Sequence, residues 1–188
     1  MAETARLTQK GLRTRERIID AAGELFLTQG MAATTLDDVK AAAGVSSSQL
    51  YHYFESKGDL VLRDWARFVV DNFRSFDCCG GCPLGSLGGE AAEYEERARQ
   101  AISASLRRWE GVLREALTQL ADSGQLGLGA DPGALAIVLV VALEGGLLLG
   151  KIHRSSRPLE VALAHAIDHI ASFSAPARPS WAAEMVSN

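Results

Sequence analysis

Three helix-start signals follow one another closely between Thr34 and Lys57, in the stretch TTLDDVKAAAGVSSSQLYHYFESK. In each signal a hydroxyl residue precedes an acid or amide by three positions, as in a capping box. The pairs are Thr35 with Asp38, Ser46 with Gln49, and Ser56 with Asp59. Gly44 tolerates a positive φ, so the chain can turn between the first two helices. The stretch therefore predicts two short helices joined by a tight turn, followed at once by a third helix.

Apolar residues at helical spacing give these helices a common core. The inward positions are Leu36, Val39 and Ala43 in the first short helix, and Leu50 and Phe54 in the second. A preceding helix is expected over residues 14–29, because an apolar stripe runs along it and Gly30 follows it. The stripe consists of Ile18, Ala22, Leu25 and Phe26. We expect it to pack on the two short helices, and we assign it no chemistry.

Two helices joined by a glycine turn are typical of a helix-turn-helix, whose second helix enters the major groove of DNA. The exposed side chains of that helix would be small or hydrogen-bonding, which suits base edges and phosphates. They are Ser47, Ser48, Gln49, Tyr51, His52 and Tyr53. A pair of packed helices with solvated polar faces has the same periodicity, so the pattern alone leaves both interpretations open.

The stretch from about Arg13 to Leu62 closely resembles the DNA-binding domain of TetR-family transcriptional repressors. The matching segments are Thr34-Thr35, Ala43-Gly44-Val45-Ser46, Leu50-Tyr51-His52-Tyr53-Phe54 and Ser56-Lys57. The resemblance implies an all-α fold with an N-terminal three-helix DNA-binding domain that contains the helix-turn-helix. It also implies a C-terminal helical domain for ligand binding and dimerisation. We place the first domain at residues 1–56 and the second at 57–174, with a tail at 175–188.

The resemblance also implies roles for individual residues. Ser47, Ser48, Gln49 and His52 match positions that reach base edges, and Tyr51 serves either a base or a phosphate. Thr35, Tyr53 and Lys57 match positions that touch the DNA backbone, and Ser46 of the turn completes the DNA-binding set. Lys57 also sits in the first turn of a helix, where a cation opposes the helix dipole unless a phosphate lies there too.

The net charge of −4 is unusual for a DNA-binding protein, but its distribution matters more than its sum. Residues 6–17 carry +4, which leaves −8 for the rest of the chain. The basic residues are Arg6, Lys10, Arg13, Arg15 and Arg17. This segment is either a basic arm that contacts phosphates or a solvated leader. Family members often carry such an extension.

The third helix of the stretch is expected to continue to about Phe76, and aromatic residues form a stripe along it. This stripe, Trp65, Phe68, Phe73 and Phe76, is either ordinary core or the wall of a ligand cavity. A further helix is expected over 91–123, and Trp109 is the large side chain on its apolar face. In TetR-family proteins the fourth helix lines a cavity in the C-terminal domain. The candidate pocket residues implied are Trp65, Phe68, Phe73, Trp109, Leu113 and Leu143.

Residues 77–89, DCCGGCPLGSLGG, contain five glycines and one proline and predict a loop. The clustered thiols Cys78, Cys79 and Cys82 are compatible with a thiol sensor, half a zinc site or three reduced thiols. No second pair of ligands lies nearby, so we assign no metal. One branch of TetR-family proteins has a GCPLGSL-like segment here. Three cysteines in no secreted framework indicate a reducing cytoplasm.

Residues 133–150 form the most apolar stretch, long enough to suggest a membrane span. Glu144 and the adjoining glycines argue instead for a buried helix covered from two sides. We expect Glu144 to be paired at a helix edge near solvent, or else to be a polar group in the ligand cavity. The last helix presents one apolar face, formed by Leu159, Leu163, Ala166, Ile167, Ile170 and Phe173. Family members dimerise through their last two helices, so we expect a homodimer.

The resulting hypothesis is a DNA-binding transcriptional regulator in the bacterial cytoplasm. The resemblance implies a repressor that binds a palindromic operator as a dimer and is released by a small, largely apolar molecule. The alternative is a thiol-redox-sensing repressor that uses Cys79 and Cys82. An enzyme is disfavoured, because the histidines His52, His153, His165 and His169 accompany no nucleophile motif or metal-ligand spacing. The sequence indicates no cofactor.

Overall fold

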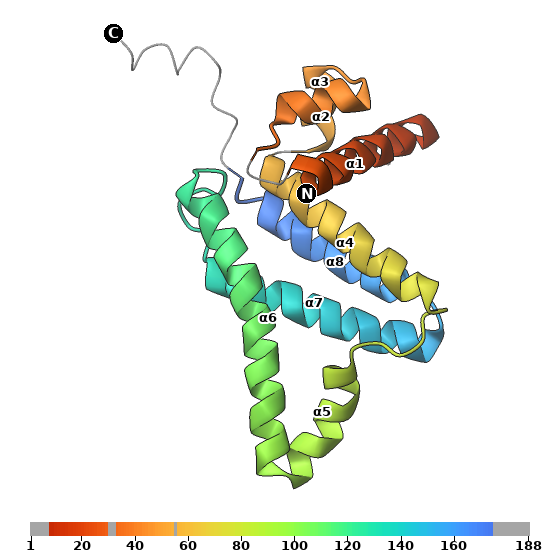
Figure 1. Cartoon of the computed structure of the whole chain (residues 1–188), viewed down its shortest axis with the longest axis vertical. Coiled ribbons are helices and arrows are strands. Elements are labelled where there is room, and N and C mark those ends of the chain that lie inside the picture. The colour runs from red at the N-terminus through yellow and green to blue at the C-terminus, as the bar shows by residue number, and fades with distance from the viewer. Residues whose placement is uncertain (1–7, 30–32, 55, 175–188) are drawn as a thin grey trace, which may run out of the picture. The chain divides into compact units, whose positions relative to one another are not determined.

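The computed structural model describes residues 8–29, 33–54 and 56–174, and these residues are almost entirely helical (Figure 1). The helices are α1 (Gln9–Gln29), α2 (Leu36–Ala43), α3 (Ser47–Tyr53), α4 (Lys57–Ser75), α5 (Pro83–Tyr94), α6 (Glu96–Asp122), α7 (Pro132–His153) and α8 (Arg157–Ala171). No strand forms within the described ranges, where β pairing is limited to an isolated bridge between Leu126 and Ser174. The all-α prediction is confirmed.

Contacts divide the chain into two compact units, one ending at Asp64 and the other beginning at Trp65. The first unit contains the helix-turn-helix. In its core, Ile18 and Ala22 of α1 pack with Val39 of α2, with Leu50 of α3 and with Phe54, the residue that ends α3. These side chains are almost completely buried, as their helical spacing predicts.

Helix α1 begins five residues earlier than residue 14, the start expected from the apolar stripe. Thr8 explains the difference, because its Oγ1 accepts a hydrogen bond from the Gly11 N–H at 3.2 Å and caps the first turn. Lys10 and Arg13 therefore lie on a helix and not on an extended arm. Arg6 lies outside the described residues, as does the tail expected over 175–188.

The loop expected over residues 77–89 is only half correct, because α5 begins at Pro83. Proline at the first helical position needs no amide partner, and the following glycines are tolerated because neighbouring helices approach closely. A Cβ on Gly85 would clash with Oε2 of Glu144, and one on Gly88 would lie 3.1 Å from Ile102. Packing against distant residues thus decides the conformation of a segment whose composition alone favours a loop.

The single helix expected over residues 91–123 is in fact split. Glu95 adopts an extended conformation, with φ −137° and ψ 110°, and ends α5 before α6 begins. Helices α5 and α6 meet at this break and diverge from it, α7 contacts α6, and α8 contacts α7 (Figure 1). A core beneath them joins Val70 and Phe73 of α4 to Leu143 of α7 and to Leu159 and Leu163 of α8.

Helix α7 is the one helix among the described residues that is long and apolar enough to cross a membrane. Length and composition are weak evidence for a span, since core helices of soluble proteins share them. Its inner side is buried by the chain itself, at Leu135, Ala136, Leu139, Leu143, Gly146 and Gly150. Its outer side leaves Ile137, Val138, Val141, Leu148, Leu149 and Ile152 exposed.

Glu144 is half-buried on α7 and faces the start of α5. Its Oε2 lies against Gly85 of α5, and its Oε1 is buried with no hydrogen-bond partner among the described residues. Glu144 is also absent from the lining of the aromatic cavity described below. The carboxylate is instead held between α7 and the start of α5, where the glycines leave room for it.

Candidate nucleic-acid interface and ligand cavity

Both short helices of the helix-turn-helix begin with complete capping boxes. Thr35 Oγ1 accepts from the Asp38 N–H at 3.2 Å, and Asp38 Oδ2 accepts from the Thr35 N–H at 2.8 Å. Hydrogen bonds from the Thr35 side chain and backbone lower the pKa of Asp38. Ser46 and Gln49 repeat the arrangement, at 3.2 Å and 3.0 Å. The start of each helix is therefore determined by local sequence.

The turn between the two helices depends on Gly44, which has φ 61° and ψ 43°. Its N–H donates to the Ala41 carbonyl at 3.2 Å, and the next N–H, from Val45, donates to the Lys40 carbonyl at 3.1 Å. These bonds end α2 in the left-handed conformation that glycine adopts most easily. The glycine turn predicted from sequence is thus present in the structure.

Helix α3 presents a continuous polar surface made of Ser47, Ser48, Gln49, Tyr51 and His52, all of which are exposed. Tyr53 is half-buried and packs on the core of the unit. The capping box occupies Oε1 of Gln49, so its side-chain amide N–H groups remain to meet base acceptors. Ser48 Oγ lies 2.9 Å from Ser46 Oγ. The predicted base-reading residues therefore share one exposed face.

Lys57 is half-buried at the start of α4, and Thr35 is exposed at the start of α2. Ser56 caps α4, because its Oγ accepts from the Asp59 N–H at 3.1 Å. The side chains of Lys10, Arg13 and Lys57 make no hydrogen bond or ion pair within the described residues. These cations are consequently available to an external anion.

Two arginines of α1 have contacts that the sequence did not indicate. Arg17 Nε donates to the Ala43 carbonyl at 2.9 Å. The Arg15 guanidinium lies over the Phe54 ring, 5.7 Å from its centroid. No local sequence signal marks either contact, because the partners are separated by more than 25 residues. Arg17 is therefore not simply part of a solvated basic leader.

A cavity of about 830 Å³ lies among α4, α6 and α7, in the second unit. It is called the aromatic cavity below. All six predicted pocket residues line it, namely Trp65, Phe68, Phe73, Trp109, Leu113 and Leu143. The remaining lining residues are Val69, Asn72, Phe76, Cys79, Gly80, Gly81, Cys82, Pro83, Val112 and Leu147. No acidic or basic side chain is among these lining residues, and Asn72 contributes the one side-chain amide.

The three cysteines have different environments. Cys79 is exposed at the aromatic cavity, and its sulfur accepts a hydrogen bond from Arg154 Nη1 at 2.6 Å. Cys78 and Cys82 are buried. Burial is the main cause that raises the pKa of the Cys82 thiol, and a hydrogen bond with Glu144 raises it further. Among the described residues no group of three or more metal-ligating side chains comes together.

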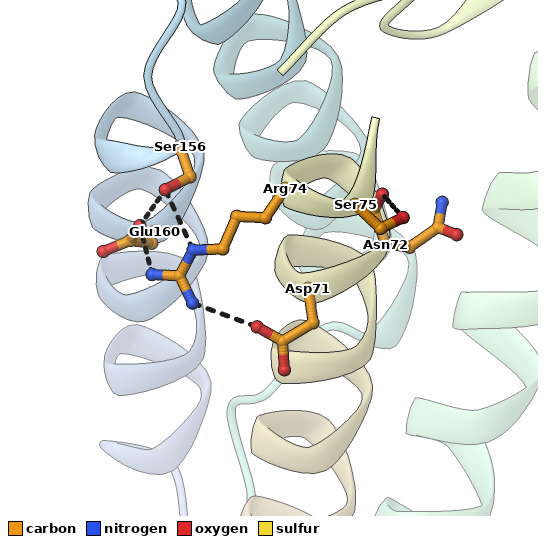
Figure 2. A network of polar contacts seen from close by, with 6 residues as sticks. All are labelled: Asp71, Asn72, Arg74, Ser75, Ser156 and Glu160. Carbon is orange, nitrogen blue, oxygen red and sulfur yellow. Dashed lines mark hydrogen bonds and ion pairs between the residues drawn. The ribbon is translucent and has the colours of Figure 1, made fainter. Parts of the chain in front are cut away.

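An ion-pair network joins the last turn of α4 to the first turn of α8 (Figure 2). Arg74 donates to Ser156 Oγ at 3.1 Å, to Glu160 Oε1 at 2.8 Å and to Asp71 Oδ1 at 3.0 Å. Figure 2 shows the amide of Asn72 on the other side of α4 from Arg74. One face of α4 thus lines the cavity while another is tied to α8.

Family models cover most of the chain. The model for bacterial regulatory proteins of the tetR family matches residues 18–63. A second model, the C-terminal domain of LmrA/YxaF-like transcriptional regulators, matches residues 61–165, which is more than half of the chain. The two matches meet within α4 and together span the helix-turn-helix and the aromatic cavity.

Individual relatives agree with this assignment. An uncharacterized HTH-type transcriptional regulator of Mycobacterium tuberculosis is 27% identical over 181 residues, covering 78% of this chain and 89% of the relative. The repressor NemR of Escherichia coli is 27% identical over 188 residues, and the match covers 85% of this chain and 94% of NemR. The crystal structure of a TetR regulator from Chloroflexus aurantiacus has a TM-score of 0.51 and 26% identity, covering 90% of this chain and all of that one.

These matches are to transcriptional regulators and not to enzymes, in agreement with the expectation from sequence. The capped helix pair with its exposed polar face lies within the segment that the tetR-family model matches. From these observations together, the chain belongs to the TetR family and is a DNA-binding transcriptional regulator.

Proposed function

We propose that the protein is a homodimeric repressor that binds a palindromic operator and is released by a small, neutral, largely apolar ligand. The observation that carries the DNA-binding part is the surface of α3. Its start is held by a capping box, its inner residues Leu50 and Phe54 are buried, and its outer residues are all polar. A short rigid helix with this division suits insertion into a major groove.

In this proposal the exposed residues of α3 read bases. Gln49 offers amide donors, and His52 and Tyr51 are long enough to reach base edges. Ser47 and Ser48 are short, so part of their readout passes through water. Lys57, Thr35 and Tyr53 contact phosphates and fix the orientation of the helix. Ser46 holds the start of α3 through its capping box.

The dimer proposal rests on the outer side of α7. Its exposed valines, leucines and isoleucines form an apolar surface that water solvates poorly, and Val161 of α8 is exposed as well. A second copy of the same surface would bury it in a four-helix interface. A two-fold dimer then predicts operator half-sites separated by about 34–36 Å, or a multiple of that distance.

The ligand proposal rests on the aromatic cavity. Five aromatic side chains and several aliphatic ones line it, so it favours apolar molecules. Because the lining carries no charged side chain, a charged ligand would lose its hydration without gaining an ion pair. The side-chain amide of Asn72 can donate a hydrogen bond to a polar group of the ligand and accept one from it. Release of DNA requires about 1–3 kcal/mol of coupling between ligand and operator.

Selection of bound duplexes from a random library tests the DNA-binding part. We expect a palindrome whose half-site spacing fits a dimer, and sedimentation should show two chains per duplex. Gln49→Ala should relax the preference at one position of each half-site, and an unchanged preference would remove Gln49 from base readout. A monomer that binds no duplex at low salt would contradict the proposal as a whole.

A second candidate trigger is oxidation of a thiol, the alternative that the sequence left open. The specific observation in its favour is the exposure of Cys79, because a thiol that senses an oxidant must be accessible to it. Burial of Cys82 makes it a poor partner for Cys79 in this role. If Cys79 senses oxidants, hydrogen peroxide should release operator DNA from the wild type and not from Cys79→Ser. Peroxide insensitivity of the wild type would leave the ligand as the trigger.

As a DNA-binding regulator the protein would act in the bacterial cytoplasm. The sequence feature that supports this location is the set of three clustered cysteines in no secreted framework. Separation of cells into cytoplasm, membrane and medium, followed by immunodetection, tests this location.

A further inference from the structure

Arg17 makes a contact that connects α1 to the turn of the helix-turn-helix. Its Nε–H donates to the carbonyl of Ala43 at 2.9 Å, across 26 positions of the sequence. Ala43 is the last residue of α2 and directly precedes Gly44, where the chain turns toward α3. The basic segment around Arg17 was interpreted as either a phosphate-contacting arm or a solvated leader, but this geometry gives Arg17 a partner inside the protein.

The carbonyl of Ala43 needs such a partner. The last four carbonyls of a helix have no amide partner within it. At the end of α2 the Gly44 N–H donates to the Ala41 carbonyl and the Val45 N–H to the Lys40 carbonyl. They leave the Ala43 carbonyl to Arg17. A cationic donor at this end of a helix also complements its dipole.

A second arginine of α1, Arg15, contacts the residue that ends α3. The Arg15 guanidinium lies over the ring of Phe54, the residue that ends α3. Phe54 is 1% exposed, so the ring is fixed in the core of the unit. Helix α1 therefore holds both the turn before α3 and the residue after it, and each contact restricts how α3 can tilt.

We propose that Arg17 is a positioning residue for DNA binding, acting through its N–H on Ala43 and not through its charge on a phosphate. The hydrogen bond fixes the turn and thereby the direction in which α3 projects. This inference rests on the proposed function, in which α3 reads the operator. It assigns Arg17 a different role from Lys57, whose ammonium group has no partner among the described residues.

The two roles differ in their dependence on salt. A side chain that neutralises a phosphate releases counterions, and each such contact adds about −0.9 to the slope of log K against log salt. A hydrogen bond within the protein releases none. Loss of a positioning contact therefore lowers affinity by the same factor at every salt concentration and leaves the slope unchanged.

Three substitutions separate the donor from the charge. In Arg17→Gln the amide nitrogen is bonded to Cδ, as Nε is in arginine, so a neutral donor remains in place. Arg17→Lys keeps the charge but puts a methylene where Nε was, and Arg17→Met keeps neither property. We expect Met and Lys to lower affinity for the selected operator roughly tenfold, the order of one lost hydrogen bond. Gln should stay within about threefold of the wild type, and all slopes should be equal.

Operator affinity is measured by fluorescence anisotropy over a range of salt concentrations, with Lys57→Gln as the matched control. That control should reduce the slope by about 0.9 per bound subunit. Circular dichroism and thermal melting show whether each variant is folded. If Arg17→Met fails to fold, the reciprocal Gln and Lys variants still give opposite results for the two roles.

The proposal is overturned if Lys retains affinity while Gln loses it together with slope, because Arg17 would then be a phosphate contact. It is also overturned if all three variants bind like the wild type. Failure of the proposed function has a different signature, since the wild type would then bind no duplex or Lys57→Gln would leave the slope unchanged.

Discussion

Gly146→Ala tests how closely α7 and α8 approach each other. A Cβ at this position would lie 2.7 Å from Leu159 Cα, 2.8 Å from Leu159 Cδ1 and 3.2 Å from Leu159 Cβ. The nearest of these atoms belongs to the backbone of α8, so rotation of a side chain cannot relieve the contact. Gly146 is therefore a position where the two helices touch without an intervening side chain.

The size of the effect follows from two opposing terms. Alanine is favoured over glycine in a helix by about 0.8–1.0 kcal/mol. Adding a methyl group to a fully packed site costs about 1–3 kcal/mol. Gly89→Ala in α5 supplies the matched control, because nothing lies within 4 Å of its Cβ and only the favourable term applies. Relative to Gly89→Ala, Gly146→Ala should be less stable by about 1–3 kcal/mol.

Urea unfolding followed by circular dichroism measures both variants, at one protein concentration because stability of a dimer depends on concentration. We expect Gly89→Ala to unfold at a higher urea concentration than the wild type. Gly146→Ala should unfold at a distinctly lower concentration than Gly89→Ala, with a similar m value. Equal stabilisation by both substitutions would show that α7 and α8 are not in backbone contact at Gly146.

Four further predictions concern side chains. Asp131→Ala should destabilise the protein by about 1 kcal/mol in thermal melts, because Asp131 accepts from two amide groups at the start of α7; no loss would contradict its capping role. A double-mutant cycle on Arg74 and Glu160 should give at most about 1 kcal/mol and weaken in salt, since the pair is partly exposed; a larger, salt-insensitive value would contradict this. Cys79 should react first with a thiol reagent in the folded protein. Folding raises the pKa of Cys82, so the protonated thiol stabilises the folded state. This stabilisation should be complete below the pKa of the unfolded thiol and should be lost as the pH rises above about 9. The Cys82→Ala variant should therefore lose less stability over this pH range in thermal melts.

The helix-turn-helix could be read from sequence because its determinants are local. Each cap and its partner are three residues apart, and Gly44 supplies the turn within the same short stretch. Propensity, capping and apolar spacing all favour the same helices here, and tertiary contacts do not override them. The observed bounds of α2 and α3 follow directly from Thr35, Gly44 and Ser46.

Helix α5 was missed because its determinants are distant in sequence. Glycine disfavours a helix locally, and residues 77–89 contain five glycines. In the structure Gly85 makes room for Glu144 and Gly88 makes room for Ile102, so the glycines serve close packing. The contact between Arg17 and Ala43 is of the same kind, since nothing near either residue in the sequence indicates it.

The aromatic stripe of α4 illustrates how spacing can locate a surface without identifying its role. The stripe was compatible with either core or cavity wall, and its members differ, because Phe73 belongs to the core while Phe68 and Phe76 are exposed. Phe68 is 71% exposed and Phe76 64% exposed, although both line the aromatic cavity. Burying a phenylalanine side chain contributes about 1.5–3 kcal/mol, so these two leave much of that free energy unused in the isolated chain. An apolar ligand that covers them would gain part of it, and a ligand that binds only the folded state would also raise the melting temperature.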